Sequence, residues 1–164
     1  MKKPGKTILV IGNCGVGKTW VMKQLISEYK LSTIAQCGKI KMRAKGTTAV
    51  LGKYIGDTYD GSDKLSMSVA TDFINLKYAQ KEFGLDVVCE GDRFMNQTFV
   101  NVLQPYVIKI EGNGEQGRQE RGSNQSERHL KAIRTRVGNM ATDKVVKDSA
   151  TALEHIKTII NGKS

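Results

Sequence analysis

Short apolar runs alternate along this chain with longer segments in which apolar residues recur every three or four positions. The short runs predict β-strands over residues 7–11, 85–89, 106–110 and 145–146. The longer segments predict α-helices over about residues 17–29, 65–83 and 96–103, from Ser126 onward, and from Asp148 or Ser149 onward. Strands that alternate with helices are typical of an α/β fold in which helices cover both faces of a mostly parallel sheet.

Four of these predicted helices have one apolar side that would face the sheet. The apolar side chains are Val21, Leu25 and Ile26, then Val69, Phe73, Leu76 and Phe83, then Leu130, Ile133 and Val137, and last Leu153, Ile156 and Ile160. Gly84 is expected to end the second helix, because glycine readily takes the left-handed conformation in which helices often stop.

Residues 39–55 hold several basic residues and no acidic residue. Within them Ile40, Met42 and Ala44 alternate with charged residues, which is the two-residue period of a strand. Lys45 and Gly46 would turn the chain into residues 47–54. The pattern predicts an excursion from the main sheet over about residues 39–64, in the form of a hairpin with one basic face, followed by a polar loop over residues 55–64 that is rich in glycine and aspartate.

The most specific motif is a G-x-x-x-x-G-K-T octet between the first predicted strand and the first helix, which is the context of a P-loop. Its glycines let the backbone turn and aim N–H groups at phosphate oxygens, and the helix N-terminus adds positive charge. Lys18 would reach the β- and γ-phosphates of ATP, and the Thr19 hydroxyl would bind Mg²⁺. The alternative is a glycine-rich turn without a ligand. The predicted nucleotide-binding residues are Gly12, Asn13, Cys14, Gly15, Val16, Gly17, Lys18 and Thr19.

Glu90, Asp92 and Arg93 follow the predicted strand at residues 85–89. Ligands of parallel α/β sheets bind beyond the carboxyl ends of the strands, so these side chains would face the P-loop. An acidic residue there can bind Mg²⁺ or accept the proton of an attacking hydroxyl, and Glu90 and Asp92 would divide these tasks. Arg93 would bind a phosphate or acceptor group, or pair with a nearby acid. In the alternative for Glu90, the residue merely ends a strand.

Arginines are concentrated between residues 113 and 140. Arg118 and Arg121 precede the fourth helix, where a lid segment would close over the triphosphate and exclude water. For Arg128, Arg134 and Arg136 on that helix, a solvent-exposed basic face fits the pattern equally well.

The acceptor of the phosphoryl group is expected to lie against residues 39–64. Lys41 and Arg43 would bind its phosphates, and Tyr54 and Tyr59 would stack on a base. Asp57 and Asp63 would hydrogen-bond a sugar or base, and a role in forming turns fits these two aspartates at least as well.

Composition adds a partner and a compartment to this picture. The 164 residues, 39% of them hydrophobic, predict one domain over residues 1–164. The formal net charge of +10 favours a polyanionic partner, with a basic protein that has none as the alternative. We expect a cytoplasmic protein (in the host cytoplasm if viral) that does not enter a membrane, because neither a signal peptide nor an apolar stretch of about 20 residues is present. The three cysteines fit neither a zinc nor a disulfide pattern, and His129 and His155 are expected on the surface or in a groove.

The order of P-loop, helical acceptor region, strand ending in Glu-Gly-Asp-Arg, arginine-rich segment, short strand and last helix resembles the nucleotide and nucleoside kinases over nearly the whole chain. Residues 51–54 (LGKY), 61–66 (GSDKLS) and 88–94 (VCEGDRF) are similar to the bacteriophage 5-hydroxymethyluridine DNA kinases, which phosphorylate the hydroxymethyl group of a modified thymine inside DNA. The resemblance implies a P-loop kinase three-layer sandwich, with ATP at residues 12–19, Glu90, Asp92 and Arg93 at the catalytic strand end, and Arg118 and Arg121 in the lid. The patterns of ordinary thymidylate kinases are not clearly present, which speaks against a free mononucleotide as the acceptor.

Three functions are therefore expected in order. The first is an ATP- and Mg²⁺-dependent kinase acting on a hydroxymethylated base in DNA, which would flip the base out or prefer exposed bases. The second is a kinase for free deoxynucleosides or deoxynucleoside monophosphates, which would share the catalytic residues. The third is a nucleotide-hydrolysing DNA-binding or switch protein, which is disfavoured because the Asn-Lys-x-Asp motif of GTPases is absent.

Overall fold

The fold is described from a computed structural model, which places residues 4–13, 15–52, 70–91, 94–112 and 127–162. The strands within these residues form one sheet in the order β2-β3-β4-β5-β1-β6-β7. The strands are β1 (Thr7–Gly12), β2 (Thr33–Cys37), β3 (Ile40–Lys45), β4 (Thr48–Leu51), β5 (Asp86–Glu90), β6 (Tyr106–Ile110) and β7 (Lys144–Val146). The helices are α1 (Lys18–Glu28), α2 (Ala70–Phe83), α3 (Gln97–Leu103), α5 (Glu127–Asn139) and α6 (Ser149–Asn161).

The sheet is mostly parallel. β1 lies between β5 and β6 and runs parallel to both, β4 runs parallel to β5, and β7 runs parallel to β6. β3 runs antiparallel to its neighbours β2 and β4. For each pair of parallel neighbours, the chain between the two strands contains at least one helix, because parallel strands need a long crossover connection.

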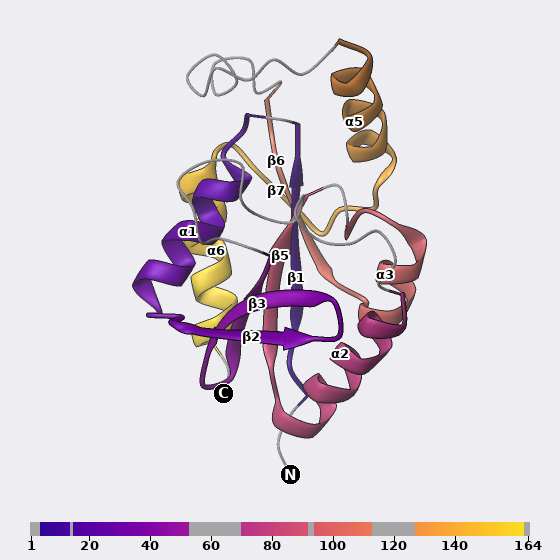
Figure 1. Ribbon diagram of the computed structural model, residues 1–164. Helices are drawn as coiled ribbons and strands as arrows, with labels where there is room; N and C mark the ends of the chain where they lie inside the picture. Colours follow the sequence, from indigo (N-terminus) through magenta and orange to yellow (C-terminus); the bar gives the residue numbers. More distant parts are fainter. Residues whose placement is uncertain (1–3, 14, 53–69, 92–93, 113–126, 163–164) are drawn as a thin grey trace.

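Helices cover the sheet on both faces, with α1 and α6 on one face and α2 and α3 on the other (Figure 1). Alternate residues of the central strands pack into two separate hydrophobic cores, because successive side chains of a strand point to opposite faces of the sheet. Ile8 and Val10 pack in the core with α1 and α6. Leu9 and Ile11 pack in the core with α2, α3 and Val137 of α5. The predicted α/β class with a helix-covered, mostly parallel sheet is confirmed.

Most predicted elements are confirmed with small changes at their ends. The hairpin predicted from residues 39–55 is formed by β3 and β4, which turn at Gly46. β4 pairs with β5, so the hairpin is part of the central sheet rather than an excursion from it. β2 was not predicted, because its residues Thr33–Cys37 show no clean alternation of apolar and polar positions. Residues 65–69 of the second predicted helix lie outside the described part of the chain.

The prediction that Phe83 faces the core is wrong. Phe83 is 60% exposed, whereas Gln80, one turn earlier, is completely buried. The Gln80 amide donates hydrogen bonds to the Thr7 hydroxyl (2.8 Å) and the Lys6 carbonyl (3.2 Å). The chain entering β1 presents polar groups at this point, so a glutamine satisfies them where an apolar side chain would not. Gly84 follows Phe83 with a φ of 66° and ends α2 as predicted.

Val21, Leu25, Phe73, Leu76, Leu130, Val137, Leu153, Ile156 and Ile160 are buried, as their spacing predicts. Ile26 is only partly buried, and the neighbouring turn instead buries Met22. Within the described residues, no helix combines the length and apolar character that crossing a membrane requires.

Candidate active site

The P-loop and the acidic strand end meet at one edge of the sheet. β1 and β5 are adjacent and parallel, and Val10 lies opposite Glu90 in their register. The segments that follow the two strands therefore emerge side by side. This is the carboxyl edge of the central strands, where α/β sheets bind their ligands.

The backbone of the P-loop depends on its glycines. Gly17 precedes α1 with a φ of 98°, and Gly15 has a φ of 91°. A Cβ atom on Gly17 would lie 2.9 Å from the Cβ of Ser149, the first residue of α6. Only glycine fits this position, because a side chain would combine left-handed strain with a steric clash.

Asn13 attaches the P-loop to the neighbouring strand connection. Its side-chain amide donates a hydrogen bond of 2.7 Å to the carbonyl of Gly112, just beyond β6. Its backbone carbonyl accepts a bond from the Val16 N–H (3.3 Å). These bonds hold the loop between β1 and β6 and help preorganise it for an incoming ligand. Cys14 lies outside the described residues.

The Lys18 ammonium group is held within the loop by backbone carbonyls. It donates hydrogen bonds to the carbonyls of Gly12 and of Asn13, the latter at 3.2 Å. Lys18 is also the first residue of α1, so the positive end of the helix dipole lies in the same place. A lysine at this position can exchange its carbonyl partners for phosphate oxygens. The loop and Lys18 therefore fit the phosphates of a nucleoside triphosphate.

Thr19 and Glu90 are brought together from positions far apart in the sequence. The Thr19 hydroxyl donates a hydrogen bond to Oε1 of Glu90 over 3.5 Å, and Glu90 is only 5% exposed. Next to it, burial raises the pKa of the Cys89 thiol well above its usual value, and the negative charge of Glu90 adds to the rise. Cys89 is therefore a neutral, buried thiol, as its position in an apolar run predicts.

These two oxygen groups fit the donor set of Mg²⁺, which commonly takes one or two protein oxygens together with phosphate oxygens and water. Among the described residues, no group of three or more His, Cys, Asp or Glu side chains gathers into a metal site. A divalent cation here would thus take most of its ligands from the nucleotide and from water.

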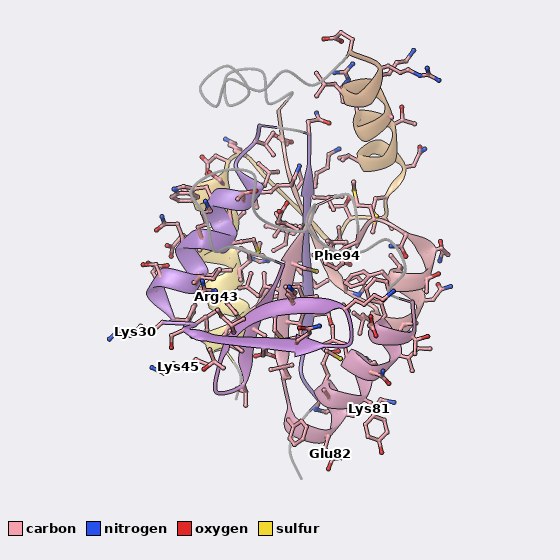
Figure 2. The ribbon with its side chains drawn as sticks, viewed as in Figure 1. Lys30, Arg43, Lys45, Lys81, Glu82 and Phe94 are labelled. Atoms are coloured by element: carbon pink, nitrogen blue, oxygen red, sulfur yellow. The ribbon has the colours of Figure 1, made fainter. Side chains whose placement is uncertain are left out.

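Lys41 and Arg43 are not adjacent to the P-loop. They lie on β3, which β4 and β5 separate from β1, a distance of about 14 Å at the usual strand spacing. Both side chains are half-buried and point to the sheet face opposite Met42, since they alternate with it along the strand. The Nε atom of Arg43 is buried without a hydrogen-bond partner in the part of the chain that the structure describes, and Figure 2 shows Arg43 among the side chains of the sheet.

The other predicted site residues lie outside the described part of the chain. They are Asp92 and Arg93 beyond β5, Tyr54, Asp57 and Asp63 in the acceptor loop, and Arg118 and Arg121 in the lid segment. Arg128 and Arg134 are exposed on α5, as the alternative of a solvent-exposed basic face predicts.

Two contacts that shape this site were not predicted from the sequence. Asn13 was counted as one of several loop residues, yet its side chain anchors the loop. Of the two candidate first residues of the last helix, Asp148 is the cap, since it accepts a hydrogen bond from the Thr151 N–H, and Ser149 instead lies against Gly17. Neither role has a local sequence pattern, because each joins the P-loop to a segment about 100 residues or more away.

Comparison with models of known protein families finds no match to this chain, and none of the curated proteins compared with it matches either. The functional argument therefore depends on the geometry of the site and on the motifs themselves.

Proposed function

We propose that this protein is a P-loop kinase that transfers the γ-phosphoryl group of ATP, with Mg²⁺, to the hydroxymethyl group of 5-hydroxymethyluracil bases in DNA. The observation that carries the phosphotransferase proposal is the meeting of Lys18, Thr19 and Glu90 at one edge of the sheet. A phosphate-binding loop beside a buried carboxylate is the arrangement that phosphoryl transfer requires, since that reaction depends mainly on positioning and charge neutralisation.

In the proposed reaction the hydroxymethyl oxygen attacks the γ-phosphorus. A new O–P bond forms, the bond between the γ-phosphorus and the bridging oxygen breaks, and ADP leaves with that electron pair. Glu90 or Asp92 accepts the hydroxyl proton, and Lys18 neutralises charge on the transferring group. Mg²⁺, when bound near Thr19 and Glu90, would supply further positive charge to the phosphates. In this proposal Arg118 and Arg121 close over the triphosphate and exclude water.

The position of Lys41 and Arg43 supports an extended acceptor. These cations lie about 14 Å from β1 by strand spacing, so they are too far away to contact a transferring phosphoryl group. A polymer that occupies the P-loop edge would reach them, whereas a free mononucleotide would not. The net charge of +10 favours the same kind of partner, because positive charge attracts DNA and releases its counterions.

The test is a transfer assay with γ-labelled ATP and Mg²⁺. Its three acceptors are a duplex containing 5-hydroxymethyluracil, the same duplex containing thymine, and a mixture of free deoxynucleosides and deoxynucleoside monophosphates. We expect label in the modified duplex alone, and none with the Lys18→Ala variant. Label on the free monomers alone would overturn the DNA substrate and support the alternative kinase. ATP hydrolysis without any labelled acceptor would overturn the kinase proposal and support a nucleotide-dependent switch.

A further inference from the structure

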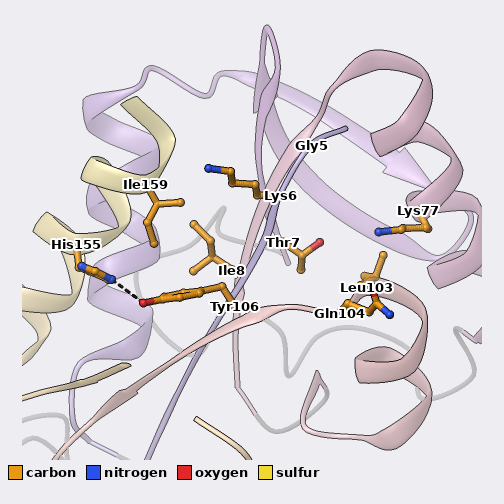
Figure 3. Close-up of a pocket in the computed structure, with 10 residues that line it drawn as sticks. All are labelled: Gly5, Lys6, Thr7, Ile8, Lys77, Leu103, Gln104, Tyr106, His155 and Ile159. Atoms are coloured by element: carbon orange, nitrogen blue, oxygen red, sulfur yellow. Dashed lines mark hydrogen bonds between the residues drawn. The ribbon is translucent and has the colours of Figure 1, made fainter. Parts of the chain in front are cut away.

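A hollow lies at the opposite edge of the sheet from the P-loop. It has a volume of about 460 Å³ and wraps around the amino ends of β1 and β6, between α6 on one side and α2 and α3 on the other (Figure 3). Small-molecule sites commonly have volumes of about 300–1,000 Å³, so the hollow is large enough for a metabolite. It takes no part in the proposed phosphoryl transfer, because it lies at the other edge of the sheet.

Hydrogen-bond donors gather on the side of the hollow formed by α2 and α3. Lys77 of α2 extends toward Thr7 in Figure 3, and Gln104 brings an amide from the end of α3. The Thr7 oxygen already accepts a hydrogen bond from Gln80 (2.8 Å), which orients the hydroxyl. A hydroxyl that accepts one hydrogen bond can also donate its own hydrogen. An ammonium, a hydroxyl and an amide together form a donor set that suits a phosphate group.

The side formed by α6 is largely apolar and aromatic. Ile8, Tyr106 and Ile159 line it, and the Tyr106 hydroxyl is hydrogen-bonded to Nε2 of His155 at 3.1 Å. The two rings lie with centroids 5.8 Å apart and an angle of 35° between their planes. This contact fixes the Tyr106 ring in place, so the hollow offers a preformed flat surface beside an aliphatic one.

The charged residues that line the hollow are both basic. Lys6 and Lys77 lie on opposite sides of β1, and none of the described residues that line the hollow is acidic. An anion is therefore favoured over a neutral or cationic ligand.

We propose that this hollow binds a small organic phosphate that carries a flat ring, which is the chemistry of a nucleoside monophosphate. The phosphate lies against Lys77, Thr7 and Gln104, and the ring lies against Tyr106 and Ile159. Lys6 adds positive charge at the rim. The site is separate from the P-loop, and its occupation does not depend on the proposed kinase activity.

The test is a chemical-shift titration of the full-length, isotope-labelled protein with thymidine 5′-monophosphate, thymidine and inorganic phosphate in parallel. The affinity is taken from the signals of Thr7, Tyr106 and His155, so binding near the P-loop does not contribute to it. We expect thymidine 5′-monophosphate to bind with a Kd between about 10 μM and 1 mM, and the other two compounds to bind at least about tenfold more weakly. Equal affinity for inorganic phosphate, or shifts confined to the P-loop, would overturn the proposal.

Charge reversal on α2 supplies a matched pair of variants. Lys77→Glu should weaken binding at the hollow at least about tenfold, because it replaces a donor with a repelling charge. Lys81→Glu changes the net charge equally on the same helix, outside the lining of the hollow, and should change the affinity less than about twofold. Lys77→Gln keeps a polar side chain and provides the same comparison if Lys77→Glu does not fold. Equal effects at the two positions would show that binding follows net charge alone and would refute the site.

The Lys18→Ala variant separates this proposal from the kinase proposal. It should lose ATP binding while the titration at Thr7, Tyr106 and His155 stays unchanged. If both bindings are lost in a folded Lys18→Ala protein, the ligand binds at the P-loop and the second site does not exist.

Discussion

Replacement of Gly17 by alanine tests the geometry of the P-loop directly. Gly17 has a φ of 98°, and an added Cβ would lie 2.9 Å from Ser149 Cβ and 3.0 Å from Ser149 Oγ. The left-handed conformation costs an alanine about 1–2 kcal/mol. Crowding against a side chain at the start of α6 adds about 1–3 kcal/mol. We therefore expect Gly17→Ala to lower the free energy of unfolding by about 2–5 kcal/mol.

Two other glycines separate these contributions. Gly46, in the turn between β3 and β4, has a φ of 61° and an added Cβ would meet no atom within 4 Å, so Gly46→Ala should show strain alone, about 1–2 kcal/mol. Gly138 in α5 has neither a positive φ nor a neighbour within 4 Å, so Gly138→Ala should stabilise the protein by about 0.5–1 kcal/mol.

Ser149→Gly completes the design, because it removes both atoms that the new methyl group would meet. In that background Gly17→Ala should cost only backbone strain, at least as large as that measured at Gly46, because the φ of Gly17 lies further from the region an alanine tolerates. The difference between the two backgrounds is the coupling energy of a double-mutant cycle, expected at about 1–3 kcal/mol.

Stabilities would be measured by urea denaturation, followed by circular dichroism, with an ATP titration of each folded variant. A loss of about 3 kcal/mol corresponds to a shift of about 1–3 M in the urea midpoint, given urea slopes of about 1–3 kcal/mol per M for small domains. The reasoning is refuted if Gly17→Ala is no more destabilising than Gly46→Ala, or if Ser149→Gly leaves its cost unchanged. Either result would mean that Gly17 and Ser149 are not in close contact.

Three further results are expected. Lys18→Ala should abolish phosphoryl transfer while leaving the urea midpoint nearly unchanged, since its ammonium group donates to the loop carbonyls of Gly12 and Asn13 and its side chain belongs to neither hydrophobic core; residual transfer near the wild-type rate would contradict its role. Reversing the charge of Lys41 and Arg43 together should weaken DNA binding and reduce the slope of log K against log salt by about 2, while ATP binding is spared; unchanged DNA affinity would remove β3 from the DNA surface. The hydrogen bond that a backbone N–H in the first turn of α6 donates to Asp148 lowers the pKa of that carboxyl, so its stabilising effect should be full above the ordinary Asp pKa of about 3.9 and disappear as the pH falls through the lowered value. A stability difference between the wild type and Asp148→Ala that does not shrink in acid would contradict this.

The elements that could be predicted are those whose causes lie within a few residues. β1 and β5 are buried at every position and β6 at most of its positions, so each contains a short apolar run, because central parallel strands are covered on both faces. α6 shows its buried side through the spacing of Leu153, Ile156 and Ile160. The glycine-rich motif could also be found from the sequence, because its signature is local. Gly15 and Gly17 have the positive φ angles that the motif predicts for its glycines. Part of the predicted site, including Asp92 and the two lid arginines, lies outside the described residues and stays a prediction.

The contacts that a residue makes with distant segments could not be predicted in the same way. Phe83 has the spacing of a core residue, yet it lies at the end of α2 and is exposed, while Gln80 is buried because the entrance of β1 offers it a hydroxyl and a carbonyl. β2 has no readable alternation and exists through its pairing with β3. In both cases the deciding groups come from another segment, so no window of neighbouring residues contains them.

The amino-acid sequence by itself determined the α/β class, the glycine-rich turn between β1 and α1, and the basic strand at residues 40–45. Only the tertiary structure decided that Thr19 meets Glu90, that Ser149 restricts Gly17, and that Tyr106 and His155 frame a hollow at the opposite edge of the sheet. The physical reason is the range of the forces involved. Periodicity and backbone conformation act between near neighbours in the chain, whereas strand order and helix packing bring together groups that are about 50 to 130 residues apart.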